Sequence, residues 1–196
     1  QSFKKKISHD MLAFVLPDLS DANPKAYHLS LATKAFAIGK NSRLHQRLFN
    51  DEKIIDSVRV HTYSGINDGA TMILIMSKKG ANLTKIIEIF QEELEQFYRH
   101  GLRHIELTEQ KQELIHFHRY SFEYMESLAS NLGSEELATD FQEFFAYPEK
   151  IKNLSNAEIT KVINKYFDPK ILQIYHCGKQ KLDETNILTK MNEKNI

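Results

Sequence analysis

The sequence predicts an α+β fold, with a mostly antiparallel sheet and helices packed on one face of it. Three observations support this prediction. Short apolar or alternating segments occur early, midway and late in the chain, and segments with helical periodicity separate them. A turn-rich stretch at residues 65–69 joins two of the strand-like segments directly, as in a hairpin. With 196 residues and 41% hydrophobic content, the chain is long enough to bury one sizeable core.

Two elements are expected before residue 40. Residues 10–16 (DMLAFVL) form a short apolar run, which indicates a strand that ends at Pro17. Asn23-Pro24 then offers an N-cap followed by proline at the first helical position, and Gly39 is a typical C-terminal stop. We therefore expect a helix between these two points.

Residues 40–60 (KNSRLHQRLFNDEKIIDSVRV) connect this helix to the next strand. The segment starts basic, becomes acidic, and ends in the alternating residues of a strand over 58–64. Residues 70–76 (ATMILIM) are apolar throughout, which is typical of a strand covered on both faces. We interpret residues 40–60 as a helix-to-strand corner and the two strands as a hairpin.

The clearest helix is expected to begin at an Asn82 N-cap and to end at His100-Gly101. Its apolar residues recur at helical spacing; they are Leu83, Ile86, Ile87, Phe90, Leu94, Phe97 and Tyr98. We expect five of them to face the sheet: Leu83, Ile86, Phe90, Leu94 and Phe97. Residues 106–140 are expected to be helical but more polar, with an interruption at residues 131–133.

The last helix and strand follow a similar logic. Ser155 and Glu158 form a capping-box pattern before an apolar helical face, and Asp168-Pro169 ends that helix. Residues 171–177 (ILQIYHC) are the final expected strand.

We assign residues 1–180 to a single α+β domain. Residues 181–196 are rich in Lys, Asn, Glu and Thr, and we expect them to form a polar, disordered tail. The chain starts with QSFKKKISHD, which has neither an initiator methionine nor the apolar core of a signal peptide. We therefore expect it to be a fragment of a longer protein.

Composition argues against several classes of protein. The 26 Lys and Arg residues balance 26 Asp and Glu residues, so no net field attracts nucleic acid or an anionic membrane. The longest apolar runs fall far short of the roughly 18 residues that indicate a membrane span. The single cysteine, Cys177, rules out an internal disulfide, and we expect it to be a small buried residue of the last strand.

No catalytic motif is present in the sequence. The patterns HExxH and HxxEH and the glycine-rich phosphate loops are all absent. His100 and His104 are spaced like ligands on one helical face, but no carboxylate completes the three or four ligands that zinc normally takes. His116 and His118 are two residues apart, so on a helix they point in different directions, and we expect them to be exposed or to cap. We predict no catalytic residue and no metal ligand in this chain.

A basic cluster opens the corner and consists of Lys40, Arg43, His45 and Arg47. Phosphate binding requires a basic surface that its own neighbours do not neutralise. Acidic residues follow this cluster at once; they are Asp51, Glu52 and Asp56. We therefore expect no nucleic-acid partner.

Three segments carry a family pattern. Ser42-Arg43-Leu44 followed by Leu48 matches an SRLxxxL segment, and Glu106-Leu107 with Lys111 matches an EL-x-x-x-K helix start. Residues 154–169 match an ending of the form vT-x-x-d-v…kYl-x-P. In this order the segments resemble the pitrilysin and insulinase family of zinc peptidases. The resemblance covers about residues 8–179 and is to the second, C-terminal domain of the bacterial and mitochondrial-processing-type members.

The resemblance implies a clamshell domain of the mitochondrial-processing-peptidase type. Such a domain is non-catalytic and helps to enclose an extended peptide, while an HxxEH motif and a downstream glutamate hold zinc in a preceding domain. No cofactor is then expected in this chain, and zinc is expected in the upstream domain of the full-length protein. The implied partners are that N-terminal catalytic domain, a peptide substrate, and a related peptidase subunit in a homo- or heterodimer.

The resemblance also suggests two substrate-binding residues, Arg43 and Arg47, because they lie in the SRLxxxL segment. Family members often carry an arginine directly after the second leucine and a tyrosine shortly before the strand. Phe49 and Asp56 stand at those places here, so that pair is not expected in this chain. A structural alternative stays open for both arginines, which could pair with nearby acidic residues and hold the corner together.

Two further interpretations stay open. The chain could belong to a catalytically inactive relative that acts as a scaffold or as the heterodimer partner of an active subunit, or it could be an unrelated α+β interaction module. An upstream HxxEH motif would separate the first of these from an active peptidase. The sequence specifies no compartment; the exported bacterial members of the family make a periplasmic location an expectation by analogy, beside a cytoplasmic one.

Overall fold

The computed structural model describes residues 9–20, 23–64, 68–138 and 140–180. Its elements confirm the α+β class that the sequence predicts. In chain order they are β1 (Met11–Leu19), α1 (Ala26–Ala37), η1 (His45–Asp51), β2 (Ile55–Ser64), β3 (Asp68–Ser77), α2 (Leu83–His100), α3 (His104–Tyr120), α4 (Met125–Ala138), α5 (Gln142–Asn153), α6 (Asn156–Tyr166), η2 (Pro169–Ile171) and β4 (Gln173–Cys177).

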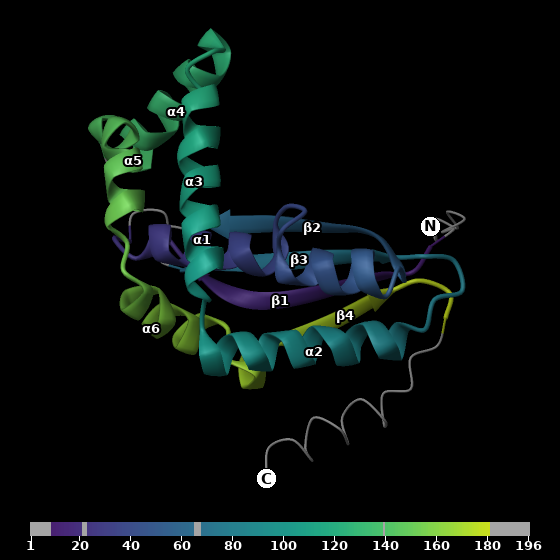
Figure 1. Ribbon diagram of the computed structural model, residues 1–196. Coiled ribbons are helices and arrows are strands. Elements are labelled where there is room, and N and C mark those ends of the chain that lie inside the picture. The colour runs from purple at the N-terminus through teal and green to yellow at the C-terminus, as the bar shows by residue number, and fades with distance from the viewer. Residues whose placement is uncertain (1–8, 21–22, 65–67, 139, 181–196) are drawn as a thin grey trace.

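The described strands form one antiparallel sheet in the order β2-β3-β1-β4. The predicted hairpin is confirmed, because β2 pairs with β3 from Ser64 opposite Gly69 as far as Ile55 opposite Ser77. β1, although first in the chain, lies inside the sheet between β3 and β4 (Figure 1). The N-terminal and C-terminal strands are therefore neighbours, with Phe14 opposite Ile174.

β1 is longer than the sequence indicates, because it continues through Pro17 to Leu19. A proline cannot donate to a sheet ladder and is confined to edges and strand ends. β4 pairs with β1 only as far as Val15, so beyond that residue β1 is itself an edge on that side. The strand can therefore include Pro17 while it keeps its pairing with β3 opposite Ala70.

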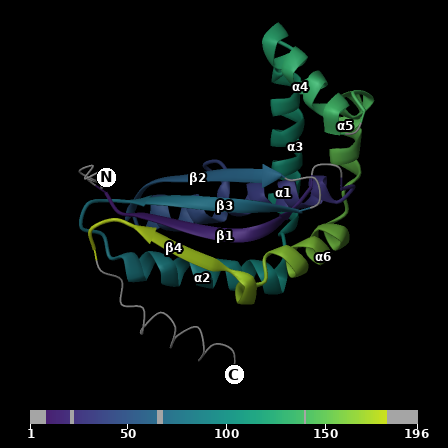
Figure 2. The same cartoon turned by 180° about the vertical axis from the view of Figure 1, so that it is seen from behind.

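One face of the sheet carries the hydrophobic core. Leu12, Phe14, Ile73 and Ile75 point to this face and are fully buried. Helices α1, α2 and α6 cover it (Figures 1 and 2), and the aromatic rings of α1 and α2 meet there. Burial confirms the expected inward face of α2, which consists of Leu83, Ile86, Phe90, Leu94 and Phe97, and Ile87 is buried as well.

Two predicted helix starts are confirmed by their hydrogen bonds. The Asn82 side chain accepts from the backbone N–H of Lys85 at 3.3 Å and caps α2. Ser155 accepts from the backbone N–H of Glu158 at 3.2 Å, and its hydroxyl donates to the Glu158 carboxylate at 2.5 Å. Both caps satisfy backbone donors that a helix start leaves without a partner.

The opposite face of the sheet is open, and the expectation that residues 70–76 are covered on both faces is wrong. Along β3, Thr71, Ile73 and Ile75 are buried, whereas Met72 and Leu74 are only half-buried. Figure 2 views the sheet from this side, and no described helix lies in front of it. The run is apolar throughout although only every second residue is in the core of the described chain.

Helices α3, α4 and α5 form a lobe that projects from the end of α2, away from the sheet (Figure 1). The predicted interruption at residues 131–133 is wrong, because α4 runs through it. The break lies instead at residues 121–124, between α3 and α4. The Ser121 hydroxyl donates to the backbone carbonyl of His118 at 2.6 Å, a local bond that competes with continued helix.

Two further predictions concerned single residues and are wrong. His118 is buried, because its ring stacks on Tyr147 at 4.9 Å between centroids and contacts Phe144 at 4.4 Å. Cys177 is exposed, because the alternation of the edge strand β4 places it on the open face opposite Met11.

The tail that we expect to be disordered, residues 181–196, lies outside the described residues, as do the first eight residues. Within the described chain, no helix combines the length and the apolar character needed to cross a bilayer.

Candidate functional site

The part of the corner that precedes β2, residues 40–54, contains both predicted substrate-binding arginines, Arg43 and Arg47. α1 ends before Gly39, whose φ of 88° favours glycine, and the Ser42 hydroxyl donates to the Gly39 carbonyl at 2.8 Å. Leu44 and Leu48 are fully buried and fix the following turn against the core. The sequence-based interpretation of this segment as a packed corner is therefore confirmed.

The corner contains a feature that the sequence did not indicate. Residues His45–Asp51 form a π-helix, in which the Glu52 N–H donates to the Arg47 carbonyl at 3.1 Å. Lys53 follows with a φ of 56°, which is unusual for a residue other than glycine. π-Helical turns are rare and occur often at functional sites, which draws attention to the side chains of this segment.

Arg43 lies at the base of the corner, with a side chain that is only 12% exposed. Its guanidinium donates two hydrogen bonds to the Glu106 carboxylate, at 2.8 and 2.7 Å, and one to the Gly101 carbonyl at 2.9 Å. It also lies over the Phe97 ring, 4.8 Å from the centroid. This bidentate, stacked geometry ties the corner to the junction between α2 and α3.

Glu106 is the buried acid that this arrangement requires, and its side chain is 8% exposed. Burial raises the pKa of Glu106, but hydrogen bonds from Arg43 and Arg103 lower it by more, and the pKa falls below its ordinary value. The carboxylate also accepts from the Arg103 backbone N–H at 2.8 Å and so caps α3. The family motif at Glu106 thus has a structural function here.

Lys111, the third residue of that motif, has a related function. Its ammonium donates to the carbonyls of Lys152 and Leu154, at 2.8 and 2.6 Å. These bonds connect α3 to the last turn of α5 and to Leu154, which follows it. Burial lowers the pKa of Lys111.

Arg47 differs from Arg43 in its surroundings. Its side chain is 42% exposed and makes two long ion pairs, to Glu52 at 3.7 Å and to Glu93 at 3.9 Å. Burial raises the pKa of Glu93, and the two arginines offset only part of that effect. Exposed pairs of this length hold a side chain weakly, so the Arg47 guanidinium can exchange these partners for another acceptor.

Both arginines line one surface hollow of about 400 Å³ between the corner and α2. Its other described lining residues are Asn41, Gln46, Asp51, Glu93, Gln96, His100 and Arg103. Sequence reasoning missed Glu93 and Arg103, which come from other elements; the helical spacing of α2 gave no sign that Glu93 would be half-buried beside Arg47.

The described residues do not fit a zinc ion. Nowhere in the described chain do three or more His, Cys, Asp or Glu side chains gather as metal ligands. His100 lines the hollow together with Arg43, Arg47 and Arg103, and these positive charges would repel a metal ion bound at His100. We therefore assign no metal to the described part of this domain.

Comparison with known proteins gives the chain a family. Residues 3–114 match the family described as peptidase M16 inactive domain. No curated protein sequence matches the chain closely enough to count as a relative.

Several solved structures share the fold. A protease from Helicobacter pylori has a TM-score of 0.80 and 14% identity over 88% of this chain and 42% of its own. A peptidase M16 inactive domain from Pseudomonas fluorescens has a TM-score of 0.79 and 14% identity over 91% of this chain and 42% of its own. A protein of Bordetella parapertussis described as the inactive peptidase domain of a zinc protease has a TM-score of 0.75 and 14% identity, over 93% of this chain and 98% of its own.

The chain thus spans 42% of the length of the Helicobacter pylori protease and nearly all of the Bordetella parapertussis domain. At these identities the structural likeness shows the fold, whereas the family match covers more than half of the sequence. Together with the described α+β fold, this match identifies the chain as a member of the peptidase M16 inactive domain family.

Proposed function

We propose that this chain is the non-catalytic domain of a zinc-dependent metallopeptidase and that it helps to enclose an extended peptide substrate. A preceding domain of the same polypeptide holds the zinc and cleaves the peptide in this proposal. Membership of the M16 inactive domains supports the non-catalytic assignment. The share of 42% of the Helicobacter pylori protease supports the existence of a further domain.

The open face of the sheet is the observation that carries the proposal. Its centre is a row of apolar side chains from β1 and β3: Met11, Ala13, Val15, Met72, Leu74 and Met76. Tyr63 on β2 and Tyr175 on β4 flank the row and are exposed. A contiguous apolar patch of this kind marks an interaction surface, because a soluble domain gains by removing it from water.

We assign this face to the catalytic domain of the same polypeptide. Permanent interfaces are typically more apolar than the rest of the protein surface, whereas transient interfaces are about as apolar as that surface. A covalently linked domain also has a high effective concentration at the face. Both arguments favour a permanent neighbour over a diffusing partner, and a peptide would then be held between the two domains.

Within the domain, we propose that the hollow beside the corner contributes to peptide binding and that its two arginines have different tasks. The guanidinium of Arg43 already serves Glu106 and Gly101, so it fixes the wall. Arg47 is the better donor to a peptide carbonyl or acidic side chain, because its present ion pairs are long and exposed. Charge-assisted hydrogen bonds of this kind contribute about 1.5–3 kcal/mol.

The decisive experiment places one substitution in two proteins. Leu74→Lys should leave the thermal stability of this chain nearly unchanged, because the side chain is only half-buried. In the full-length protein it should abolish the contact between domains and lower peptide cleavage at least tenfold. Leu137→Lys is the matched control, because Leu137 is a leucine on α4 that is 91% exposed, and it should have neither effect.

Two results would contradict the proposal. If full-length Leu74→Lys cleaves peptide at the normal rate with its domains still associated, the open face is not the domain interface. If the full-length protein contains no zinc and cleaves no peptide, it is a catalytically inactive relative, and this domain is part of a scaffold protein.

A further inference from the structure

The tip of the helical lobe exposes a run of large apolar side chains (Figure 1). Residues 122–126 (FEYME), where α3 gives way to α4, are all exposed, and Tyr124 and Met125 are 65% and 82% exposed. Phe145 of α5 continues this surface, because its ring lies 6.3 Å from that of Phe122. Phe141, four positions earlier, is exposed as well. We call these five side chains, with Glu123 and Glu126 among them, the tip patch.

The tip patch is acidic as well as apolar. Residues 121–149 contain seven acidic residues and no lysine, arginine or histidine. Glu123 and Glu126 are exposed, and their carboxylates form no ion pair within the described chain. Because the whole chain has a formal net charge of zero, an excess of positive charge must lie elsewhere in it.

Exposed lysines gather at the opposite end of α2, where β2 begins and where β3 and β4 end; they are Lys53, Lys78, Lys79 and Lys179. Backbone contacts bring these segments together. The Lys78 N–H donates to the carbonyl of Ile54, the neighbour of Lys53, at 3.0 Å. The side chain of Gln180, the neighbour of Lys179, donates to the Ala81 carbonyl at 3.1 Å. We call the four residues the lysine end.

The lysine end is not neutralised by its own neighbours. None of its four ammonium groups forms an ion pair within the described chain. The acids nearby have other partners, since Glu52 pairs with Lys85, and Asp10 contacts His176. The chain therefore has an acidic, aromatic end and a basic end.

The two ends cannot meet within one chain. α2 has 18 residues, so about 27 Å of helix separates the lysine end from the start of α3. The lobe then projects away from the sheet, which places the tip patch still farther off (Figure 1).

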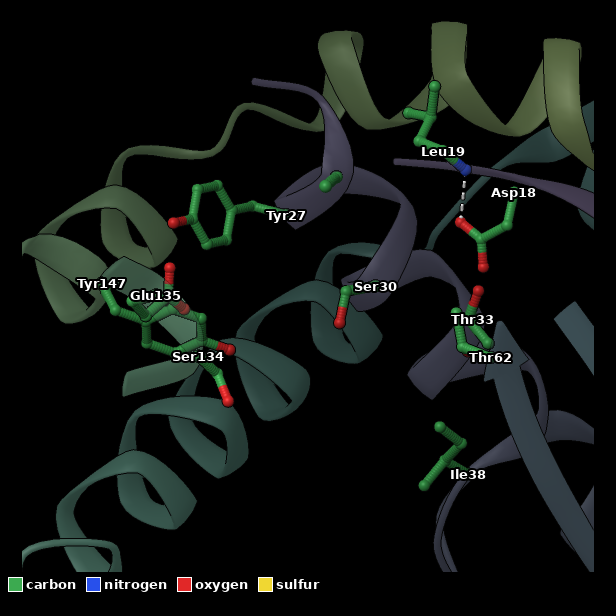
Figure 3. A pocket seen from close by; sticks show the side chains of 11 residues that line it. Asp18, Leu19, Tyr27, Ser30, Thr33, Ile38, Thr62, Ser134, Glu135 and Tyr147 are labelled. Atoms are coloured by element: carbon green, nitrogen blue, oxygen red, sulfur yellow. Dashed lines mark hydrogen bonds between the residues drawn. The ribbon is translucent and has the colours of Figure 1, made fainter. Parts of the chain in front are cut away.

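The lobe is fixed to the body of the domain at its base. Tyr27 of α1 and Tyr147 of α5 meet edge to face, with centroids 5.5 Å apart, beside a cavity of about 440 Å³ between α1 and the lobe (Figure 3). Lys34 of α1 pairs with Glu113 of α3 at 3.2 Å. These contacts position the tip patch before any partner arrives, which lowers the entropic cost of binding.

We propose that this chain associates head to tail with a second copy of itself, the tip patch of one copy lying on the lysine end of the next. Lysine is a matched partner for such a patch, because its apolar stem covers aromatic surface while its ammonium pairs with a carboxylate or lies on a ring. The contact joins two different surfaces, so each added copy leaves one tip and one lysine end free. It uses neither the open face nor the arginine hollow, so it does not depend on the proposed function.

Sedimentation velocity of this chain tests the association. The mean mass should rise with protein concentration in about 0.1 M salt and return to that of a monomer in about 1 M salt, where the Debye length falls from about 10 to about 3 Å. A chain that is monomeric at every concentration, or oligomers that persist unchanged in high salt, would overturn the proposal.

Charge reversal identifies the two surfaces. Glu123→Lys with Glu126→Lys, and separately Lys78→Glu with Lys79→Glu, should each give a monomer, because like charges then face each other. An equimolar mixture of the two variants should associate again. A mixture that stays monomeric, with both variants folded by circular dichroism, would refute the pairing of these ends.

A matched control separates this contact from a general charge effect. Glu92→Lys with Glu109→Lys reverses two exposed acids of α2 and α3 outside both surfaces, with the same change in net charge, and should associate like the unaltered chain. An equal loss of association in the control would refute the tip patch.

The aromatic part of the contact has its own test. Tyr124→Ser should weaken association about two- to fivefold, the effect of one exposed cation–π contact, whereas Tyr63→Ser, at an exposed tyrosine of β2, should not. Equal effects of the two variants would remove the tip aromatics from the contact. If the chain stays monomeric and the tip instead binds zwitterionic lipid vesicles, the second copy is refuted as its partner.

Discussion

Phe90 is the residue of α2 whose removal should disturb the core most. Its side chain is 0% exposed. Its ring stacks on Phe14 of β1, with centroids 3.7 Å apart and planes 10° apart, and meets the edge of Phe36 of α1 at 5.6 Å. The ring therefore joins the sheet to two helices, and Phe90→Ala leaves a void where three elements meet.

The expected cost follows from these contacts. Truncation of a fully buried phenylalanine costs about 3–5 kcal/mol, because the lost transfer free energy and the cavity add. Each aromatic pair adds about 0.5–1.5 kcal/mol beyond buried area, and two such pairs place Phe90→Ala in the upper half of that range. For a chain of this size, a loss of about 4–5 kcal/mol should lower the midpoint of thermal unfolding by roughly 8–20 °C.

Denaturant unfolding followed by far-UV circular dichroism measures the effect, since the chain has no tryptophan. Gln96→Ala on the exposed face of the same helix is the control and should change the free energy of unfolding by less than about 0.5 kcal/mol. A cost below about 1 kcal/mol for Phe90→Ala, with an unchanged dependence on denaturant, would refute the packing described for α2.

Four further predictions concern ionisable groups. Arg43→Ala should destabilise the chain by about 3–5 kcal/mol, because it leaves the buried Glu106 carboxylate without its main partner. Arg47→Ala should cost less than about 1 kcal/mol, because its ion pairs are exposed. Similar thermal midpoints for the two variants would contradict this contrast. If the full-length protein cleaves peptides as proposed, Arg47→Ala should raise its KM about tenfold, and a normal KM would remove Arg47 from the proposed peptide site. The pKa of Glu106 is lower in the folded chain than its ordinary value of 4.5, so its contribution to folding stability is complete above about pH 4.5 and is lost as pH falls through the folded pKa. Glu106→Gln should therefore reduce the loss of unfolding free energy at acidic pH. An unchanged loss in the variant would show that other carboxylates dominate it. Burial lowers the pKa of His118 below 6.5, so stability should be full above pH 6.5 and fall as pH drops from there through the folded pKa; His118→Phe should reduce this loss, and an equal loss in the variant would exclude His118 as its source.

Local patterns in the sequence were sufficient for much of the fold. The spacing of Leu83, Phe90 and Phe97 specifies which side of α2 meets the sheet, because helical periodicity is fixed by the backbone. Asn82 and Ser155 mark helix starts through hydrogen bonds to residues three positions away. Interactions of this range can be seen in a sequence without knowing the fold.

The open face could not be predicted in the same way. Residues 70–76 are apolar on both sides of the strand, so their composition indicates two covered faces. In the described chain only one side is covered, since Met72 and Leu74 are only half-buried and no described helix lies in front of the open face in Figure 2. In the proposed function the catalytic domain supplies the second cover, and the sequence of this chain alone does not show which partner that is.

The charged site also depended on distant residues. The only partners that the sequence suggests for the two arginines are acidic residues close to them in the chain, and Arg47 does pair with Glu52. The strong partner of Arg43 is Glu106, 63 positions away, and only the packing of the corner against the start of α3 brings the two together. The buried His118 has the same explanation, because Phe144 and Tyr147 reach it from another helix.

The most direct test of the proposed function is a parallel measurement of zinc content and peptide cleavage for two proteins, this chain and the full-length protein. The account predicts that the full-length protein binds stoichiometric zinc and cleaves an unfolded peptide in a chelator-sensitive reaction, and that this chain does neither. Stoichiometric zinc and chelator-sensitive cleavage by this chain alone would contradict the assignment of a non-catalytic domain.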